Sequence, residues 1–285
     1  MNKYFVLASR EMSEARVKSL LAKYLPRGKV VFGIAKEEFV QGFESQPQFK
    51  TLKGDFVKSL ADKSKGLLEV VEYAQKDGVA IIGKVDFNRA IIINGSFHRS
   101  FHLRPEYDAI IEKGAEVRYE SPFTSEDEAK AFAKKFEVKK SLPKFNPKTI
   151  QDIIEKESKK AFITDFQTAA AIVKDGEIIA LSHNKVVPYE TYAWHFGLER
   201  EKHKSPPGDS SKYDTVHAET AAMMNAGSGT HGATVYMQTF PCPHCARNIL
   251  HAGIKEVVYK LDYGDEYGYN LFNRAGVKYR RYSDE

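Results

Sequence analysis

The chain of 285 residues contains only two cysteines, Cys242 and Cys245, and these lie three positions apart. So close a pair cannot form the disulfide framework on which small secreted domains depend, and a reducing cytoplasm is the expected compartment. No apolar run approaches the roughly 18 residues of a membrane-spanning helix, so we expect no membrane partner. The apolar stretch at the N-terminus is also too short for a secretory signal.

Glycine-rich phosphate loops are missing as well. The sequence has no Gly-x-Gly-x-x-Gly and no Walker pattern, and it therefore gives no support for a dinucleotide or P-loop site. Internal repeats and low-complexity tracts are not apparent. Hydrophobic residues make up 42% and charged residues 28%, which is typical of a soluble globular protein long enough for two domains.

An aperiodic segment with two prolines separates the chain into halves. Residues 140–148 read as a linker, so we expect an N-terminal α/β domain over residues 1–140 and a second domain over residues 148–285. Residues 1–150 carry 27 Lys and Arg against 20 Asp and Glu, whereas the remainder carries 16 against 18. The basic surplus of the N-terminal half suits a substrate-selecting contact with phosphate, although a solvated lysine-rich surface would give the same count.

The C-terminal half shows a regular alternation of helical and strand patterns. The expected elements are a helix over 149–162, strands over 169–173 and 177–181, a polar loop over 183–213, a helix from about 215, a strand over 233–238, a helix over 243–253, a strand over 257–261, a helix over 267–274 and a strand over 277–282. This order predicts an α/β sandwich with helical crossovers between its last strands.

The N-terminal half is also mixed α/β, with a less regular pattern. Strands over 4–8 and 29–34 flank a helix over 12–25, which is typical of a βαβ unit. The remaining pattern predicts a long helix over 56–74, two strands within 79–93, and helices over 105–113 and 125–136.

Two short motifs carry the chemistry of the chain. His-x-Glu stands at residues 217–219 and Pro-Cys-x-x-Cys at residues 241–245, and this combination is the known signature of zinc-dependent nucleobase deaminases. Three ligands from His217, Cys242 and Cys245 would leave one tetrahedral position of Zn²⁺ open, as in a catalytic site. Zn²⁺ lowers the pKa of water towards about 7, and Glu219 can take and return the proton.

Two simpler interpretations of the cysteine pair remain open. A lone Cys-x-x-Cys can be a redox pair, which leaves His217 and Glu219 without a role. It can also be part of a structural zinc site, for which His231 or His244 would supply the fourth ligand.

From about Thr149 to Tyr282 the chain resembles the cytidine deaminase-like superfamily, in its deoxycytidylate and tRNA-adenosine deaminase branch. The resemblance rests on the stretches TVHAE, ATVYMQTFPCPHC, ILHAGIKEVVY and LFNRAGV. It implies a three-layer α/β/α domain with a five-stranded mixed sheet that binds Zn²⁺ and deaminates a cytosine-type base, most simply a deoxycytidylate-like nucleotide. It also implies a homodimer or a higher homo-oligomer.

The resemblance assigns roles to particular residues. His217, Cys242 and Cys245 would be the zinc ligands, Glu219 would shuttle protons, and Asn184 would contact the substrate near its sugar. The other contacts expected around the base are Ala218, Thr239, Phe240 and Pro241. Phe240 replaces the glutamate that tRNA-adenosine deaminases usually carry, which favours cytosine, and Ala221 replaces an asparagine common in deoxycytidylate deaminases.

Aromatic residues outside the motifs suggest further substrate contacts. Trp194 lies among basic residues in the loop over 183–212, which suits stacking on a base, although core packing is an equal explanation. Tyr269, in the aromatic run 263–269, is a candidate substrate contact or part of a packed turn. The stretch 97–104 alternates aromatic and basic residues and suits a nucleic-acid strip, although an edge strand with one solvated face needs no function.

Two other functions therefore stand beside nucleotide deamination. One is a deaminase that edits a base within tRNA or single-stranded DNA and uses the N-terminal domain to bind the nucleic acid. The other is a zinc-stabilised binding protein without catalysis, in which Glu219 would have no purpose.

Overall fold

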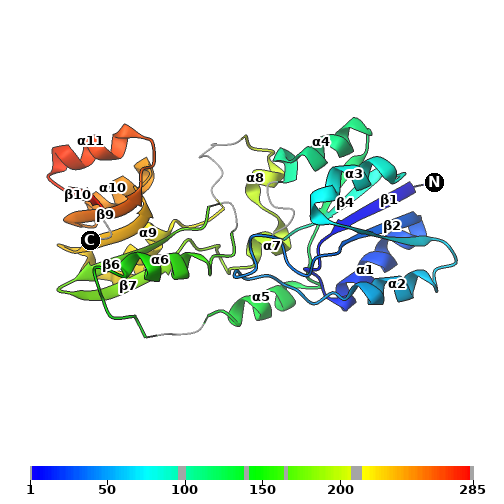
Figure 1. Ribbon diagram of the computed structural model, residues 1–285, viewed down its shortest axis with the longest axis horizontal. Coiled ribbons are helices and arrows are strands. Elements are labelled where there is room, and N and C mark those ends of the chain that lie inside the picture. Colours follow the sequence, from blue (N-terminus) through cyan, green and yellow to red (C-terminus); the bar gives the residue numbers. More distant parts are fainter. Residues whose placement is uncertain (1, 96–100, 138–140, 164–165, 207–213, 283–285) are drawn as a thin grey trace. The chain divides into compact units, whose positions relative to one another are not determined.

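The chain divides into two compact units (Figure 1). The computed structural model describes residues 2–95, 101–137, 141–163, 166–206 and 214–282. Unit 1 comprises Met1–Lys135 and Thr191–Asp214, and unit 2 comprises Phe136–Glu190 and Thr215–Glu285. The first boundary falls near the linker predicted at 140–148. Residues 191–214, which the sequence placed in the C-terminal domain, group instead with the N-terminal unit.

Unit 1 is built on a sheet of five parallel strands in the order β3-β2-β1-β4-β5. The strands are β1 (Asn2–Ala8), β2 (Gly28–Ala35), β3 (Leu68–Tyr73), β4 (Arg89–Ile93) and β5 (Glu116–Glu120). Successive residues of the central strand β1 enter separate cores, with Tyr4 and Val6 on one face and Phe5 and Leu7 on the other. An uninterrupted apolar strand of this kind is typical of a parallel sheet covered on both sides.

Helices cover both faces of this sheet. They are α1 (Glu14–Tyr24), α2 (Gly54–Ala61), α3 (Gly78–Lys84), α4 (Pro105–Glu112) and α5 (Glu126–Lys134), with 3-10 turns η1 (Leu25–Arg27), η2 (Gln75–Asp77) and η3 (Phe101–Leu103). Helix α1 begins at Ser13, whose hydroxyl accepts a hydrogen bond from the Arg16 backbone N–H. The predicted βαβ unit is therefore present as β1, α1 and β2.

Three expectations for this half were wrong. The helix predicted over 56–74 ends at Ala61, because Lys65 and Gly66 turn the chain with φ values of 52° and 80° before β3 begins. The first strand predicted within 79–93 is helix α3, in which Ile82 is buried and the adjacent Ile81 packs partly buried against the same core. Strand β5 was missed because its sequence, EVRYE, is mostly polar.

The aromatic and basic stretch 97–104 does not form the expected edge strand where it is described. Residues 96–100, including His98 and Arg99, lie outside the described residues, and Phe101–Leu103 form the turn η3.

Residues 191–206 pack on unit 1 through buried polar contacts. This segment contains α7 (Tyr192–Phe196) and α8 (Glu199–Lys202). The Glu201 carboxylate accepts hydrogen bonds from the backbone N–H of His102 at 2.9 Å and from its ring Nδ1 at 2.8 Å. His195 Nδ1 lies 2.7 Å from the Ser121 hydroxyl. These partners explain why the segment leaves unit 2, although its neighbours on both sides in sequence belong to it.

Unit 2 contains a second five-stranded sheet, in the order β10-β9-β8-β6-β7. Its elements are α6 (Ile150–Ser158), β6 (Ala169–Lys174), β7 (Glu177–His183), α9 (Ala218–Ala226), η4 (Gly227–Thr230), β8 (Thr234–Thr239), α10 (Pro243–His251), β9 (Glu256–Leu261), α11 (Glu266–Ala275) and β10 (Lys278–Arg281). Strand β6 is antiparallel to β7 and β8, whereas β8, β9 and β10 run parallel. Each helix and strand predicted for the C-terminal half is present. The polar loop predicted over 183–213 was wrong in part, because its described residues include the short helices α7 and α8.

The two faces of this sheet are covered by different helices. Ala170 and Ile172 of β6 pack in a core with residues of α9, α10 and α11. The alternate residues Ala169 and Ala171 pack against Ile150 and Ile154 of α6. In the part of the chain that the structure describes, no helix is long and apolar enough to cross a membrane.

Candidate metal centre

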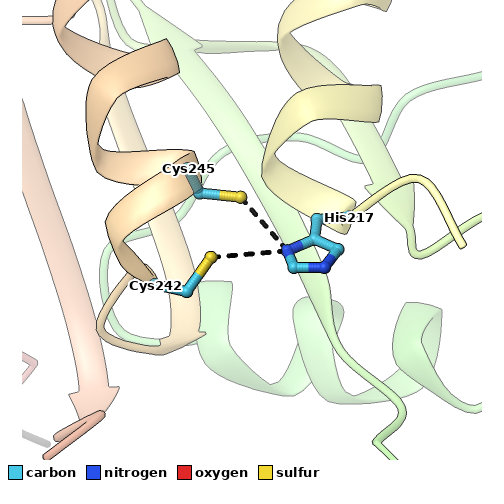
Figure 2. A group of neighbouring side chains, drawn as sticks. All are labelled: His217, Cys242 and Cys245. Carbon is cyan, nitrogen blue, oxygen red and sulfur yellow. Dashed lines mark hydrogen bonds between the residues drawn. The ribbon is translucent and has the colours of Figure 1, made fainter. Parts of the chain in front are cut away.

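Two helix N-termini bring the histidine and both cysteines together. His217 is the N-cap residue of α9, and its backbone is extended where the chain passes from Val216 into the helix. Cys242 is the N-cap residue of α10, which β8 reaches through Phe240 and Pro241, and Cys245 lies in the first turn of α10. Figure 2 shows both sulfur atoms pointing towards the same edge of the imidazole ring.

The separations between the donor atoms suit a tetrahedral zinc ion. His217 Nδ1 lies 3.6 Å from Cys242 Sγ and 3.3 Å from Cys245 Sγ, and all three donor atoms lie within 4.8 Å of one another. With Zn–N about 2.0 Å and Zn–S about 2.3 Å at tetrahedral angles, the expected N···S separation is about 3.5 Å. Two soft sulfur donors and one imidazole therefore fit Zn²⁺ in kind and in spacing.

Hydrogen bonding favours a thiolate at this centre, against the effect of burial. Cys245 is completely buried and Cys242 nearly so. The Cys245 thiol and the His217 ring lower the pKa of Cys242 to about 4, against the opposing effect of burial. The same contact with Cys242 raises the pKa of His217. The positive end of α10 also favours a thiolate at its N-cap.

Glu219 lies beside the three potential metal ligands, two residues after His217. It occupies the first turn of α9 with 7% of its surface exposed. Burial raises the pKa of its carboxyl group. A buried carboxyl group with a raised pKa is suited to accept and return a proton near neutral pH.

The two histidines considered as a fourth structural ligand do not join the cluster. His231 and His244 are both exposed, and among the described residues the group of potential ligands consists of His217, Cys242 and Cys245. Three donors leave a coordination position open, as the catalytic interpretation requires.

Asn184, the predicted sugar contact, is engaged in holding a neighbouring segment. Its Oδ1 accepts a hydrogen bond from the Thr168 backbone N–H at 3.2 Å, and its Nδ2 donates to the Phe166 carbonyl at 3.1 Å. The side chain is only 4% exposed. A substrate contact would use the second hydrogen or lone pair of the same amide and stays a prediction. Ala218 is completely buried as the first residue of α9.

Phe240 and Tyr269 form an aromatic pair under the site. Their rings stack at 3.8 Å with an interplanar angle of 11°, and Phe240 is 1% exposed. The Tyr269 hydroxyl donates to Asp262 at 2.8 Å. The Phe240 ring is therefore a core group, and only the backbone of residues 239–241 is left to line a base pocket. Of its neighbours, Thr239 is half-buried and Pro241 is buried.

Trp194 belongs to unit 1 and not to the unit that holds the cluster. Its side chain is 4% exposed, and its ring lies 6.3 Å from that of Phe132. This is the packing alternative considered from the sequence. A contact between Trp194 and a substrate stays a prediction.

Sequence reasoning missed two polar residues beside the ligands. The Thr220 hydroxyl lies 3.8 Å from Cys245 Sγ and accepts a hydrogen bond from Asn248 Nδ2 at 3.2 Å. Such contacts orient ligands and tune their basicity. Thr220 follows His217 by three residues on a predicted helix, so the helical period could have placed it on the ligand face.

The part of the chain that contains the metal cluster is similar to known deaminases. Residues 146–261 match the family described as the cytidine and deoxycytidylate deaminase zinc-binding region, which confirms the resemblance drawn from the sequence for the C-terminal half. The deoxycytidylate deaminase of Saccharomyces cerevisiae is 32% identical over 123 residues, covering 41% of this chain and 38% of that protein. The human deoxycytidylate deaminase is 43% identical over 79 residues, covering 25% and 44%.

The chain spans less than two thirds of the length of these curated relatives, including the 62% covered in the probable deoxycytidylate deaminase of Drosophila melanogaster. Among solved structures, the dCMP deaminase of cyanophage S-TIM5 in complex with dCMP and dUMP is 20% identical. That match covers 48% of this chain and 98% of the other, with a TM-score of 0.35.

Proposed function

We propose that this chain, whose residues 146–261 match a deaminase zinc-binding region, is a zinc-dependent hydrolytic deaminase of a cytosine-type nucleotide, most simply deoxycytidylate. The observation that carries the proposal is a three-donor cluster with a buried carboxyl group, Glu219, two residues after His217 in the first turn of α9. A purely structural zinc site has no use for Glu219, whereas hydrolysis of an amine needs a group that moves protons. The deoxycytidylate deaminases among the relatives support the choice of base.

The residues divide the work as follows. His217, Cys242 and Cys245 would hold Zn²⁺, which when bound makes hydroxide available near neutral pH. Glu219 would accept one proton from the attacking water and deliver it to the ring nitrogen. It would then carry the second proton, from the newly added hydroxyl group, to the amine, so that ammonia departs and the carbonyl forms. Because the Glu219 side chain is buried, the proton that it carries would be shielded from exchange with bulk water.

Substrate recognition completes the proposal. Asn184 and the backbone of residues 239–241 would contact the nucleotide, within a three-layer domain of the cytidine deaminase type. Residues 1–140 would select the substrate by the basic surplus of the N-terminal half rather than perform chemistry, since the sequence shows no phosphate loop there. Self-association through α9 fits the exposure of Met224, at 72%.

The test is a panel of cytosine, adenine and guanine compounds, as bases, nucleosides, nucleotides and oligonucleotides, assayed for ammonia at low and high salt. A nucleotide enzyme should deaminate dCMP with a weak dependence on salt. Turnover confined to oligonucleotides, with affinity falling steeply as salt rises, would replace this substrate by a polynucleotide. No ammonia from any member, with zinc bound, would leave a non-catalytic binding protein.

A further inference from the structure

A chain of buried charged groups lies at the carboxyl end of β7. His183 Nδ1 is 2.8 Å from Glu157 Oε1 on α6, and His183 Nε2 is 2.9 Å from Lys185 Nζ. The Lys185 ammonium also donates to Glu190 Oε1 at 2.8 Å. The side chains of His183, Glu157 and Glu190 are 7%, 11% and 10% exposed, whereas that of Lys185 is 37% exposed. Water therefore screens the contact between His183 and Glu157 poorly and the contacts of Lys185 more strongly.

The hydrogen-bonding roles in this chain are fixed by chemistry. An ammonium group can only donate, so Nε2 of His183 accepts from Lys185. A carboxylate can only accept, so Nδ1 carries the proton and donates to Glu157. His183 Nε2 also lies 3.4 Å from Glu190 Oε1, so the imidazole ring lies between two carboxylates and one ammonium group. The Lys160 ammonium group also donates a hydrogen bond to Glu157 and offsets the negative charge of that carboxylate.

Lys185 connects this chain of charges to the metal ligand. Its backbone N–H donates to the Val216 carbonyl at 2.8 Å, and its carbonyl accepts from the Val216 N–H at 2.8 Å. Val216 directly precedes His217, the N-cap residue of α9. The two bonds therefore fix the backbone from which the His217 side chain departs.

Glu190 fixes the loop over residues 184–190, which follows β7. Its second carboxylate oxygen accepts from the Val186 backbone N–H at 3.3 Å, which ties the residues after Lys185 into a closed turn. The far end of α9 is joined to β7 as well, because Asn225 Nδ2 donates to the Ser182 hydroxyl at 3.3 Å. The loop after β7 is thus a rigid support for α9.

We propose that Glu157, His183, Lys185 and Glu190 are positioning residues for His217. They hold the Lys185 backbone, and through its paired bonds with Val216 they set the angle at which His217 meets the two cysteines. Partners that orient zinc ligands typically change metal affinity by about 10- to 100-fold when removed. The inference rests on the proposed function only for the identity of the metal and for the activity measurement.

The experiment measures zinc affinity of the full-length protein by competition with a chromophoric chelator. Lys185→Met keeps the aliphatic part of the side chain and removes the ammonium, and it should weaken zinc binding by about 10-fold. Lys185→Arg restores a donor and should recover part of that loss. The matched control is Lys260→Met, which breaks an exposed ion pair of 2.7 Å with Glu155 on the same helix as Glu157, and should bind zinc as the wild type does.

A merely structural role would lower the unfolding temperature of Lys185→Met but leave the zinc affinity of the folded protein unchanged, and that result would overturn the proposal. If Lys185→Met does not fold, Glu190→Gln decides, because it keeps the shape and an acceptor while removing the charge. Unchanged zinc affinity in Glu190→Gln would then refute the positioning role, and weaker binding would support it. Absence of ammonia release from wild-type protein would remove the proposed function while the zinc measurement still tested this inference.

Discussion

Replacement of Gly268 by alanine should destabilise unit 2 although it places a better helix former inside α11. An ideal Cβ at this position would lie 2.7 Å from Cε1 of Phe240 and 3.5 Å from the Pro241 carbonyl oxygen. The Phe240 ring cannot withdraw easily, because it is stacked on Tyr269 at 3.8 Å and packs edge-on against Phe272.

The expected magnitude combines two opposing effects. Overpacking of a buried ring costs about 1 to 3 kcal/mol, and the gain in helix propensity from glycine to alanine is about 1 kcal/mol. Gly268→Ala should therefore lower the free energy of unfolding by up to about 2 kcal/mol. Gly83→Ala in α3 is the matched control, since nothing lies within 4 Å of its Cβ position, and it should be neutral or stabilising.

Urea unfolding of the zinc-loaded protein distinguishes these outcomes. Far-UV circular dichroism follows both units, and fluorescence of Trp194, the single tryptophan, follows unit 1. Gly268→Ala should shift the dichroism transition and leave the fluorescence transition in place. The double variant with Phe240→Leu should be less destabilised than the sum of the single changes. An increase in stability like that of Gly83→Ala would show that the packing around Phe240 has been misread.

Three further predictions concern unit 1, self-association and the metal. In Glu120→Gln the buried Arg16 guanidinium, 2.8 Å from the carboxylate, loses its counter-charge, and unit 1 should lose about 2 to 4 kcal/mol at neutral pH in urea titrations. Burial raises the pKa of Glu120, but hydrogen bonds from Lys23 and Tyr24 lower it overall, so the carboxylate stabilises the fold at pH values above its unfolded pKa. The stability difference between the wild type and Glu120→Gln should therefore shrink as pH falls through the pKa of Glu120, and a difference that stays constant would contradict this. Met224→Glu, at a 72% exposed position, should convert an oligomer to a monomer in light scattering with stability unchanged, and an unaltered mass would exclude α9 from the interface. Cys245→Ala should purify with much less than the zinc content of the wild type by atomic absorption, and full zinc content would remove Cys245 from the ligand set.

The sequence predicted unit 2 well because each level of information pointed to the same structure. The Asp-Gly turn between β6 and β7, the continuous apolar run of β6 and the glycine that ends α11 are local signals, and the structure has an element at each. The metal motif could be read for the same reason: zinc coordination demands particular side chains at particular spacings.

The errors occurred where tertiary contacts decide. Residues 54–73 contain enough helix formers for one long helix, and only the left-handed turn at Lys65 and Gly66 divides them. Nothing local shows that Trp194 and Glu201 pack on unit 1, since their partners Phe132 and His102 are more than 60 residues away in sequence. Phe240 looked like a pocket residue because it precedes Pro241 and Cys242, but its ring packs against Tyr269 and Phe272, which are about 30 residues away in sequence.

The most direct test of the proposed deaminase compares wild-type protein with Glu219→Ala for ammonia release from dCMP and for bound zinc. Glu219 is not among the three potential ligands, so the variant should retain about one zinc per chain and its fold. Its turnover should fall by at least about 100-fold, the typical contribution of general acid–base catalysis. Loss of zinc or of the fold in Glu219→Ala, or unchanged turnover, would contradict the role assigned to this carboxyl group.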